Sequence, residues 1–147
     1  MIRSGSAWDK QQITQFLRDC IIPVRLACLS ASGAPLVCSL WYLYDDDAIW
    51  CATQQSASVI KYLEQEPRCG FEVAPEAMPY RGVRGQGTAK LSVAAGEDVL
   101  LRLIDRYLGD RDTAFAAWLL KRSASEIAVK IEPDWMTAWD FGRRMRD

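Results

Sequence analysis

Cysteine is the residue of greatest intrinsic reactivity in this chain, but its spacing argues against a shared site. The number of cysteines is odd, and no two of them form the Cys-x-x-Cys pair of metal or redox sites. The five are Cys20, Cys28, Cys38, Cys51 and Cys69. Because the last four lie in apolar stretches, we expect buried, unreactive thiols in a reducing compartment, with pKa values raised by desolvation.

Histidine is absent from the sequence. Its absence excludes a Ser-His-Asp triad, a Cys-His pair, a histidine-based zinc site and a histidine-ligated haem. No other side chain stands out as a general acid or base. If the protein is an enzyme, we expect its chemistry to belong to a bound cofactor.

The polar residues best suited to holding an anion lie in two short segments. Ser56 and Ser58 fall at the start of a predicted helix, whose free N–H groups can bind a phosphate; the alternative is that they only cap the helix. Arg81 and Arg84 lie in a predicted strand, where the alternative is a solvated surface. Lys61 lies inside the helix and is a weaker candidate, since a solvent-facing position is its ordinary interpretation.

The hydrophobic pattern predicts a single domain, residues 1–147, of short strands and amphipathic helices. The first three strands are joined by tight turns, which predicts an antiparallel meander. Pro133 is expected to break the last strand, with Met136–Trp139 continuing it. In chain order the elements are a helix over 8–20, strands over 24–30, 36–44 and 48–53, a helix from 56, strands over 69–74 and 83–93, helices over 96–108 and from 112, and a strand over 127–131.

Two glycines, Gly85 and Gly87, lie inside the predicted strand over 83–93. They do not form a dinucleotide-binding fingerprint, because that motif opens a helix. We expect them to permit a β-bulge or the close approach of another backbone or a ligand.

The composition narrows the range of partners. Eighteen basic and nineteen acidic residues give a formal charge of −1, which offers no electrostatic reason to expect nucleic acid or an anionic membrane. No apolar run reaches the roughly 18 residues of a membrane span. The first residues also lack the apolar core of a signal peptide. We therefore expect a soluble, cytoplasmic protein.

The order and spacing of several segments resemble the flavin-binding split-barrel family that includes pyridoxamine 5′-phosphate oxidase. The segments begin with a strand and a tight turn, continue through an aromatic-rich strand, and end with a closing strand. They are Arg25–Leu29, Gly33–Pro35, Ser39–Tyr44, Trp50–Thr53, Leu63–Arg68, Pro79–Ala89, Ile131–Trp135 and Trp139–Asp140.

The resemblance implies a mainly β fold with helices, an antiparallel six-stranded split barrel. It also implies a homodimer with two flavin mononucleotide (FMN) molecules in clefts between the subunits. The strand beside the isoalloxazine ring maps onto Cys38, Ser39, Leu40 and Trp41, and the phosphate side maps onto Thr53, Ser56 and Ser58. Trp139 either reaches the flavin from the partner subunit or fills the interface, and Trp41 has the alternative of filling the barrel.

This sequence departs from the oxidase at its phosphate-binding cations. The oxidase has basic residues at the start of the helix and at both ends of the second strand. The corresponding residues here are Ser58, Val59, Cys38 and Leu43, and the nearby cations are Arg25, Lys61, Arg81 and Arg84. We expect Arg81 or Arg84 to supply the charge, because an arginine fork can meet two phosphate oxygens. The residues that hold the substrate phosphate in the oxidase have no counterpart, so the substrate is left open.

Three functions are compatible with the sequence. The first is an FMN-dependent oxidoreductase that passes two electrons between a nicotinamide and a small acceptor. The second is a related enzyme that uses deazaflavin, whose longer anionic tail would suit a basic groove. The third is a non-catalytic module, such as a flavin carrier or a dimeric sensor.

Overall fold

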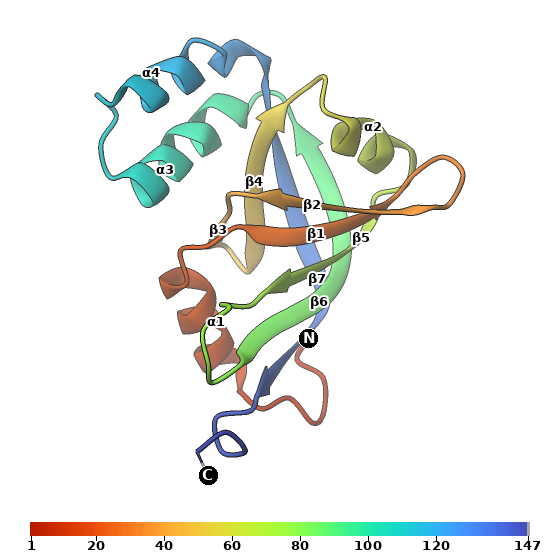
Figure 1. Ribbon diagram of the computed structural model, residues 1–147. Coiled ribbons are helices and arrows are strands. Elements are labelled where there is room, and N and C mark those ends of the chain that lie inside the picture. The colour runs from red at the N-terminus through yellow and green to blue at the C-terminus, as the bar shows by residue number, and fades with distance from the viewer. Residues whose placement is uncertain (147) are drawn as a thin grey trace.

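Residues 1–146 are described by a computed structural model, in which seven antiparallel strands form one curled sheet with four α-helices around it (Figure 1). The predicted class, mainly β with helices, is confirmed. In chain order the elements are α1 Lys10–Asp19, β1 Val24–Leu29, β2 Pro35–Leu40, β3 Leu43–Asp45, β4 Ala48–Gln54, α2 Ser58–Gln65, β5 Arg68–Val73, β6 Arg81–Ser92, α3 Gly96–Leu108, α4 Ala114–Leu120, the short 3₁₀ helix η1 Ser123–Ser125, and β7 Glu126–Asp140. Within the described residues, no helix combines the length and hydropathy needed to cross a membrane.

The predicted strand over 36–44 is in fact two strands, which is why the sheet has seven strands. β2 and β3 lie at opposite edges of the sheet, whose order is β2-β1-β5-β6-β7-β4-β3. Trp41 and Tyr42 alone connect them, and we call this link the seam. The two antiparallel pairings of the predicted meander are present, but the pairs are not adjacent in the sheet. β1 pairs with β2 and β3 pairs with β4, but β5, β6 and β7 separate the two pairs.

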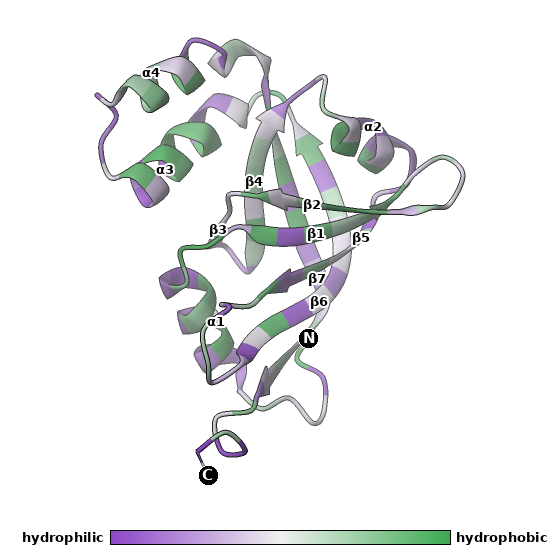
Figure 2. Cartoon of the chain, viewed as in Figure 1, coloured by the Kyte–Doolittle hydropathy of each residue, from purple (hydrophilic) through white to green (hydrophobic). Residues whose placement is uncertain are grey.

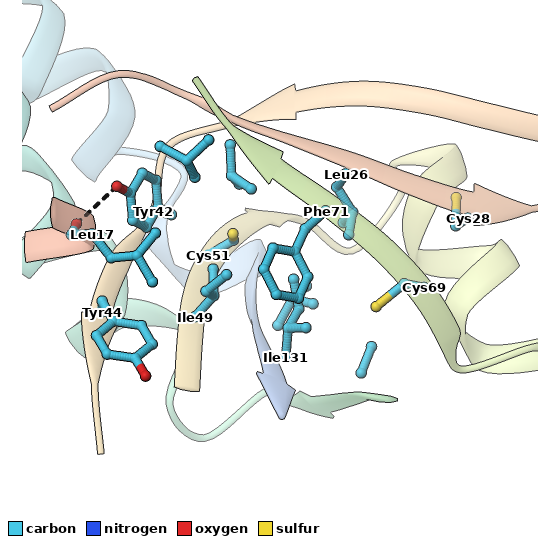
Figure 3. Packing of buried hydrophobic residues seen from close by; sticks show 14 of the residues in the cluster. Leu17, Leu26, Cys28, Tyr42, Tyr44, Ile49, Cys51, Cys69, Phe71 and Ile131 are labelled. Carbon is cyan, nitrogen blue, oxygen red and sulfur yellow. Dashed lines mark hydrogen bonds between the residues drawn. The ribbon is translucent and has the colours of Figure 1, made fainter. Parts of the chain in front are cut away.

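Tyr42 explains why the chain changes course at the seam. Its side chain is fully buried, and its hydroxyl lies 2.8 Å from the carbonyl oxygen of Leu17 (Figure 3) and 2.9 Å from that of Cys20. Its backbone N–H donates to the hydroxyl of Tyr107 at 3.1 Å. These bonds join the seam to α1 and α3, where a continuous strand would have bonded to a neighbouring strand. The apolar run over 36–44 therefore resembles one strand in the sequence, although Tyr42 in its second half binds helices α1 and α3.

β6 and β7 form the long curved pair of the sheet (Figure 1). The predicted break at Pro133 is wrong, since β7 is continuous from Glu126 to Asp140. The register shifts between Gln86 and Gly87, next to the point where Pro133 pairs, so the missing N–H of proline falls at an irregularity of the ladder. The expected bulge is confirmed there.

Apolar side chains fill both sides of the sheet. Inside the curl, buried residues of α1 and α2 meet those of the strands. Figure 3 shows Leu17 of α1 among the strand residues of this core. Outside the curl, Val99 and Leu103 of α3 pack with Ala128 of β7. Figure 2 shows hydrophobic segments along both α3 and α4, with hydrophilic ones between them in α3. This hydrophobic surface holds the two helices beside β4 and the seam.

The cysteines provide a first test of this packing. Cys28, Cys51 and Cys69 are buried as predicted, whereas Cys20 and Cys38 are half-buried. Burial raises the pKa of all five thiols, that of Cys69 to about 12. We expect a thiol reagent at neutral pH to modify Cys20 first in the native protein and to leave Cys51 and Cys69 unmodified, whereas all five should react in denaturant. Mass spectrometry of the labelled peptides measures this order, and rapid native labelling of Cys51 would contradict it.

Candidate functional site

A pocket of about 280 Å³ opens beside the seam, between the ends of β2 and β4 and the helices α3 and α4. We call it the seam pocket. It brings together four of the predicted site residues, Ser39, Leu40, Trp41 and Thr53. The other lining residues come from β4, α3, α4, the segment after α4 and the start of β7. Strands distant in the sequence therefore meet where the resemblance predicted the flavin ring.

One side of the seam pocket is aromatic and apolar. Trp41 stacks on Tyr107 with ring centroids 4.8 Å apart and planes 5° from parallel. Phe115 of α4 meets Trp41 edge-on at 6.1 Å, and Leu100 and Leu103 line the wall from α3. Phe115 is 49% exposed, which leaves the pocket open to solvent on that side. Flat, apolar walls of this kind suit a planar ring system.

The opposite end of the seam pocket is polar. Glu126, the first residue of β7, is buried with 5% of its surface exposed, and Gln54 Nε2 donates to its Oε1 at 2.6 Å. The same Gln54 nitrogen lies 3.2 Å from the carbonyl oxygen of Arg122. Burial raises the pKa of the Glu126 carboxyl, and the nearby Arg122 acts in the opposite direction. A carboxyl, a guanidinium and an amide therefore share one end of the pocket.

A further cation lies next to the pocket on β1. Arg25 pairs with Ser39 in the β1–β2 ladder, and its Nη1 donates to Ser39 Oγ at 2.8 Å. Ser39 itself lines the pocket. Among the four predicted substitutes for the missing cations, Arg25 is thus held directly against a pocket residue.

The start of α2 differs from the expected serine cap. Ala57 is the N-cap residue, and the helix has no side-chain capping hydrogen bond, so the expectation that Ser56 or Ser58 caps it is wrong. The two serines flank the N-cap position, one on each side of it. The N–H groups of the first turn are left without a side-chain acceptor from a cap. Lys61 is exposed on the same helix, which follows β4 after a short turn.

Solved structures resemble this chain, whereas no protein-family model and no curated protein matches it. A conserved hypothetical protein from Mycobacterium tuberculosis gives a TM-score of 0.79 at 22% identity, over 95% of this chain and 89% of that one. An F420 reductase gives 0.71 at 17% identity, over 92% and 98%. An FAD-binding protein from Mesorhizobium loti gives 0.65 at 18% identity, over 89% and 92%.

This chain has the split-barrel fold. The resemblance seen in the sequence is thereby confirmed for the architecture. In this split barrel the predicted ring-binding strand and the end of β4 do lie together, at the seam.

Several predicted residues lie elsewhere on the split barrel. Cys38 is half-buried and packs against the main core, on the opposite face of β2 from Ser39. Arg81 lines a separate hollow beside α1, and Arg84 is exposed opposite Thr137 of β7. Trp139 lies opposite Gly82, and its indole N–H is buried with no partner within residues 1–146. These residues do not line the seam pocket of their own chain, so a role at a flavin requires a second copy.

The polar end of the pocket has little signal in the sequence. Glu126 begins a strand of otherwise typical apolar alternation, where a carboxyl is usually solvated. Gln54 comes to face it only through the β4–β7 ladder, which joins residues far apart in the chain. Arg122 follows a short helix that carries no motif. To predict this end of the pocket, one would have to know that β4 pairs with β7.

Proposed function

We propose that this split barrel is an FMN-dependent oxidoreductase and that the isoalloxazine ring occupies the seam pocket. The observation that carries the proposal is the meeting of Ser39, Leu40, Trp41 and Thr53 around one cavity with apolar walls and a polar end. The names of two structural neighbours, an F420 reductase and an FAD-binding protein, support a cofactor of the flavin type.

The size of the seam pocket suits part of the cofactor. Ligand pockets usually measure roughly 300–1,000 Å³, and about 280 Å³ is enough for a ring system but small for a whole nucleotide. The phosphate would then lie outside, at the N-terminus of α2, where first-turn N–H groups face no capping side chain. Arg122 and Lys61 are the cations on the elements that flank this path, and they would supply charge-assisted bonds.

A bound flavin supplies two-electron transfer between a nicotinamide donor and a small acceptor. The residues of this chain would position it and shield part of the ring from water. Trp41 and Phe115 cover the ring from the apolar side, and the Ser39 and Thr53 hydroxyls offer hydrogen bonds at the edges. Preorganised polar groups in a partly closed pocket favour the cofactor without reorganisation.

The direct experiment is the absorbance spectrum of the protein as purified, followed by parallel titrations with FMN, riboflavin and F420. We expect FMN to bind and to be reduced by a nicotinamide. The resemblance to an F420 reductase, which covers 98% of that chain, favours F420 as the second candidate. Tight F420 binding without FMN binding would select a deazaflavin enzyme, and FMN binding without turnover would select a carrier or sensor. Failure to bind either cofactor would overturn the proposal.

We further propose that the protein is a homodimer that meets through the outer face of β1, β5 and β6. Arg25, Glu72 and Arg84 are neighbours across these strands and alternate in charge. Such a row can pair with itself across a two-fold axis. Val37 on the adjoining strand is 64% exposed, and large exposed apolar residues mark interfaces. This arrangement would also bring residues of one copy toward the pocket of the other.

Gly70, in the middle of this face, provides a test of the dimer. A Cβ at Gly70 would lie 3.7 Å from the carbonyl oxygen of Gly85 and 3.9 Å from the Cβ of Ala27, which are ordinary contacts. Gly70→Arg should therefore keep the fold but block the face. We expect light scattering to give a dimer for the wild type and a monomer for Gly70→Arg. Ala31→Arg, which adds the same charge in the exposed β1–β2 turn, should stay dimeric. A wild-type monomer with flavin bound would contradict the proposal.

A further inference from the structure

Ser39 is a pocket residue whose direction follows from the strand that carries it. Its neighbours Cys38 and Leu40 pack against the main core inside the curl. Because successive side chains of a strand point to opposite faces, Ser39 lies on the outer face of the sheet, where it is exposed. The pocket walls from α3 and α4 cover that same outer face. The Ser39 hydroxyl is therefore on the pocket side of β2.

Arg25 lies on the same face, on the neighbouring strand β1. It is directly opposite Ser39 in the β1–β2 ladder, and residues that face each other across paired strands share one face of the sheet. Its Nη1 donates to Ser39 Oγ at 2.8 Å. Glu72 is opposite Arg25 on β5, yet within residues 1–146 the guanidinium bonds to Ser39 and not to this carboxylate. The ladder and the hydrogen bond together hold a cation against the pocket hydroxyl.

The hydrogen bond from Arg25 determines what the Ser39 hydroxyl can do. A serine hydroxyl accepts through its lone pairs and has one proton to donate, whereas a guanidinium has no acceptor atom. The Ser39 proton therefore points away from Arg25, and no group of residues 1–146 accepts it. A charged donor also polarises the hydroxyl, which strengthens the hydrogen bond that the hydroxyl donates in turn. Ser39 thus has a polarised proton available to a ligand.

We propose that Arg25 positions Ser39 as a hydrogen-bond donor to a carbonyl oxygen of the heterocycle in the seam pocket, and that this bond favours the reduced ring. This inference rests on the proposed function. A hydride from the nicotinamide brings two electrons and one proton, so the neutral ring becomes an anion and its carbonyl oxygens gain negative charge. A polarised donor stabilises that charge more than it stabilises the oxidised ring. Ser39 touches the cofactor, and Arg25 acts through Ser39.

The test measures the reduction potential of bound FMN against a reference dye in the absence of oxygen. Arg25→Met removes both the charge and the donor. We expect it to lower the potential by about 30 mV, which is a tenfold loss of preference for the reduced ring in a two-electron couple. Arg25→Lys keeps a charged donor, so its preference should stay within about twofold of the wild type. Arg143→Met removes the same charge from an exposed side chain at a different hollow and should leave the potential unchanged.

Ser39→Ala and the double variant show whether the two residues act together. We expect Ser39→Ala to lower the potential by about as much as Arg25→Met, because each removes the same polarised donor. The double variant should then shift the potential no further than either single variant. Independent effects would add to about 60 mV, a hundredfold loss, and would overturn the claim that Arg25 acts through Ser39.

Circular dichroism and light scattering check that each variant keeps the wild-type fold and size, since Arg25 also lies on the proposed dimer face. If Arg25→Met changes either, Ser39→Ala decides, and an unchanged potential in that variant would overturn the inference. Weaker binding of both redox forms by Arg25→Met, with the potential unchanged, would place Arg25 at the phosphate and overturn the inference while FMN binding stands. Absence of flavin and deazaflavin binding by the wild type would overturn it together with the proposed function.

Discussion

Tyr42→Ala is expected to lower the free energy of unfolding by about 3–5 kcal/mol, the loss typical of truncating a large buried aromatic residue. Tyr42 is fully buried at the seam and makes hydrogen bonds to α1 and α3. Its removal would leave a cavity where β2 and β3 are linked, and the carbonyl groups of Leu17 and Cys20 would lose the tyrosine hydroxyl and keep their hydrogen bonds from Arg106. Urea unfolding followed by circular dichroism measures the change.

Two other variants separate the causes of this loss. Tyr42→Phe keeps the ring and removes the hydroxyl, so it should cost about 0.5–3 kcal/mol. Tyr80→Ala removes an aromatic ring that is 44% exposed and should change stability by less than about 1 kcal/mol. A loss for Tyr42→Ala no larger than that for Tyr80→Ala would mean that the seam does not depend on Tyr42.

Arg122→Ala is expected to weaken FMN roughly 10- to 100-fold, which corresponds to about 1.4–2.8 kcal/mol. Arg122 is the guanidinium at the polar end of the seam pocket, and its position is supported by Trp118, with the guanidinium 4.4 Å from the ring centroid. A phosphate with nearly two negative charges needs such a partner. Riboflavin has no phosphate, so its affinity should change little. Fluorescence titration measures both ligands.

The controls for Arg122 use other cations of the chain. Lys121→Ala removes the neighbouring positive charge from an exposed side chain and should leave FMN affinity within about twofold of the wild type. Arg81→Ala and Arg84→Ala test the cations expected from the sequence, and an effect there would come from a second copy. Equal weakening of FMN and riboflavin by Arg122→Ala would place Arg122 at the ring, away from the phosphate.

The spacing of apolar residues was sufficient to predict most helices and strands of this fold. The apolar stripes of α1 and α3 and the alternation along β5 and β6 identify them because each buries one face. The same reasoning failed at the seam, where Trp41 and Tyr42 are as apolar as the strands around them. It failed again at Pro133, because a proline beside a register shift does not end a strand. Both errors concern which strands pair and in what register, and the apolar pattern of a single segment does not specify either.

The candidate site was predictable only where the resemblance supplied its residues, on β2, the seam and the end of β4. Ser39, Leu40 and Trp41 are consecutive, and the resemblance was enough to select them. Glu126 and Arg122 enter the site through the pairing of β4 with β7 and through the packing of α4. Their chemistry also depends on burial, since a carboxyl at the surface would be an ordinary anion. Burial of a single polar residue is a tertiary property and leaves no periodic signal.

The strand order has a consequence for the synthesis of this protein. β2, β1, β5 and β6 form one group, β4 and β3 form another, and β7 alone joins them by pairing with β6 and β4. While the nascent chain grows, both groups can form, but the edges that β7 will cover stay open until this final strand leaves the ribosome. Long-range pairing of this kind is slow and leaves hydrophobic edges exposed. A message that terminates before β7 would therefore yield one chain whose two groups of strands are not paired with each other, and this aggregation-prone product would be a substrate for chaperones and proteases.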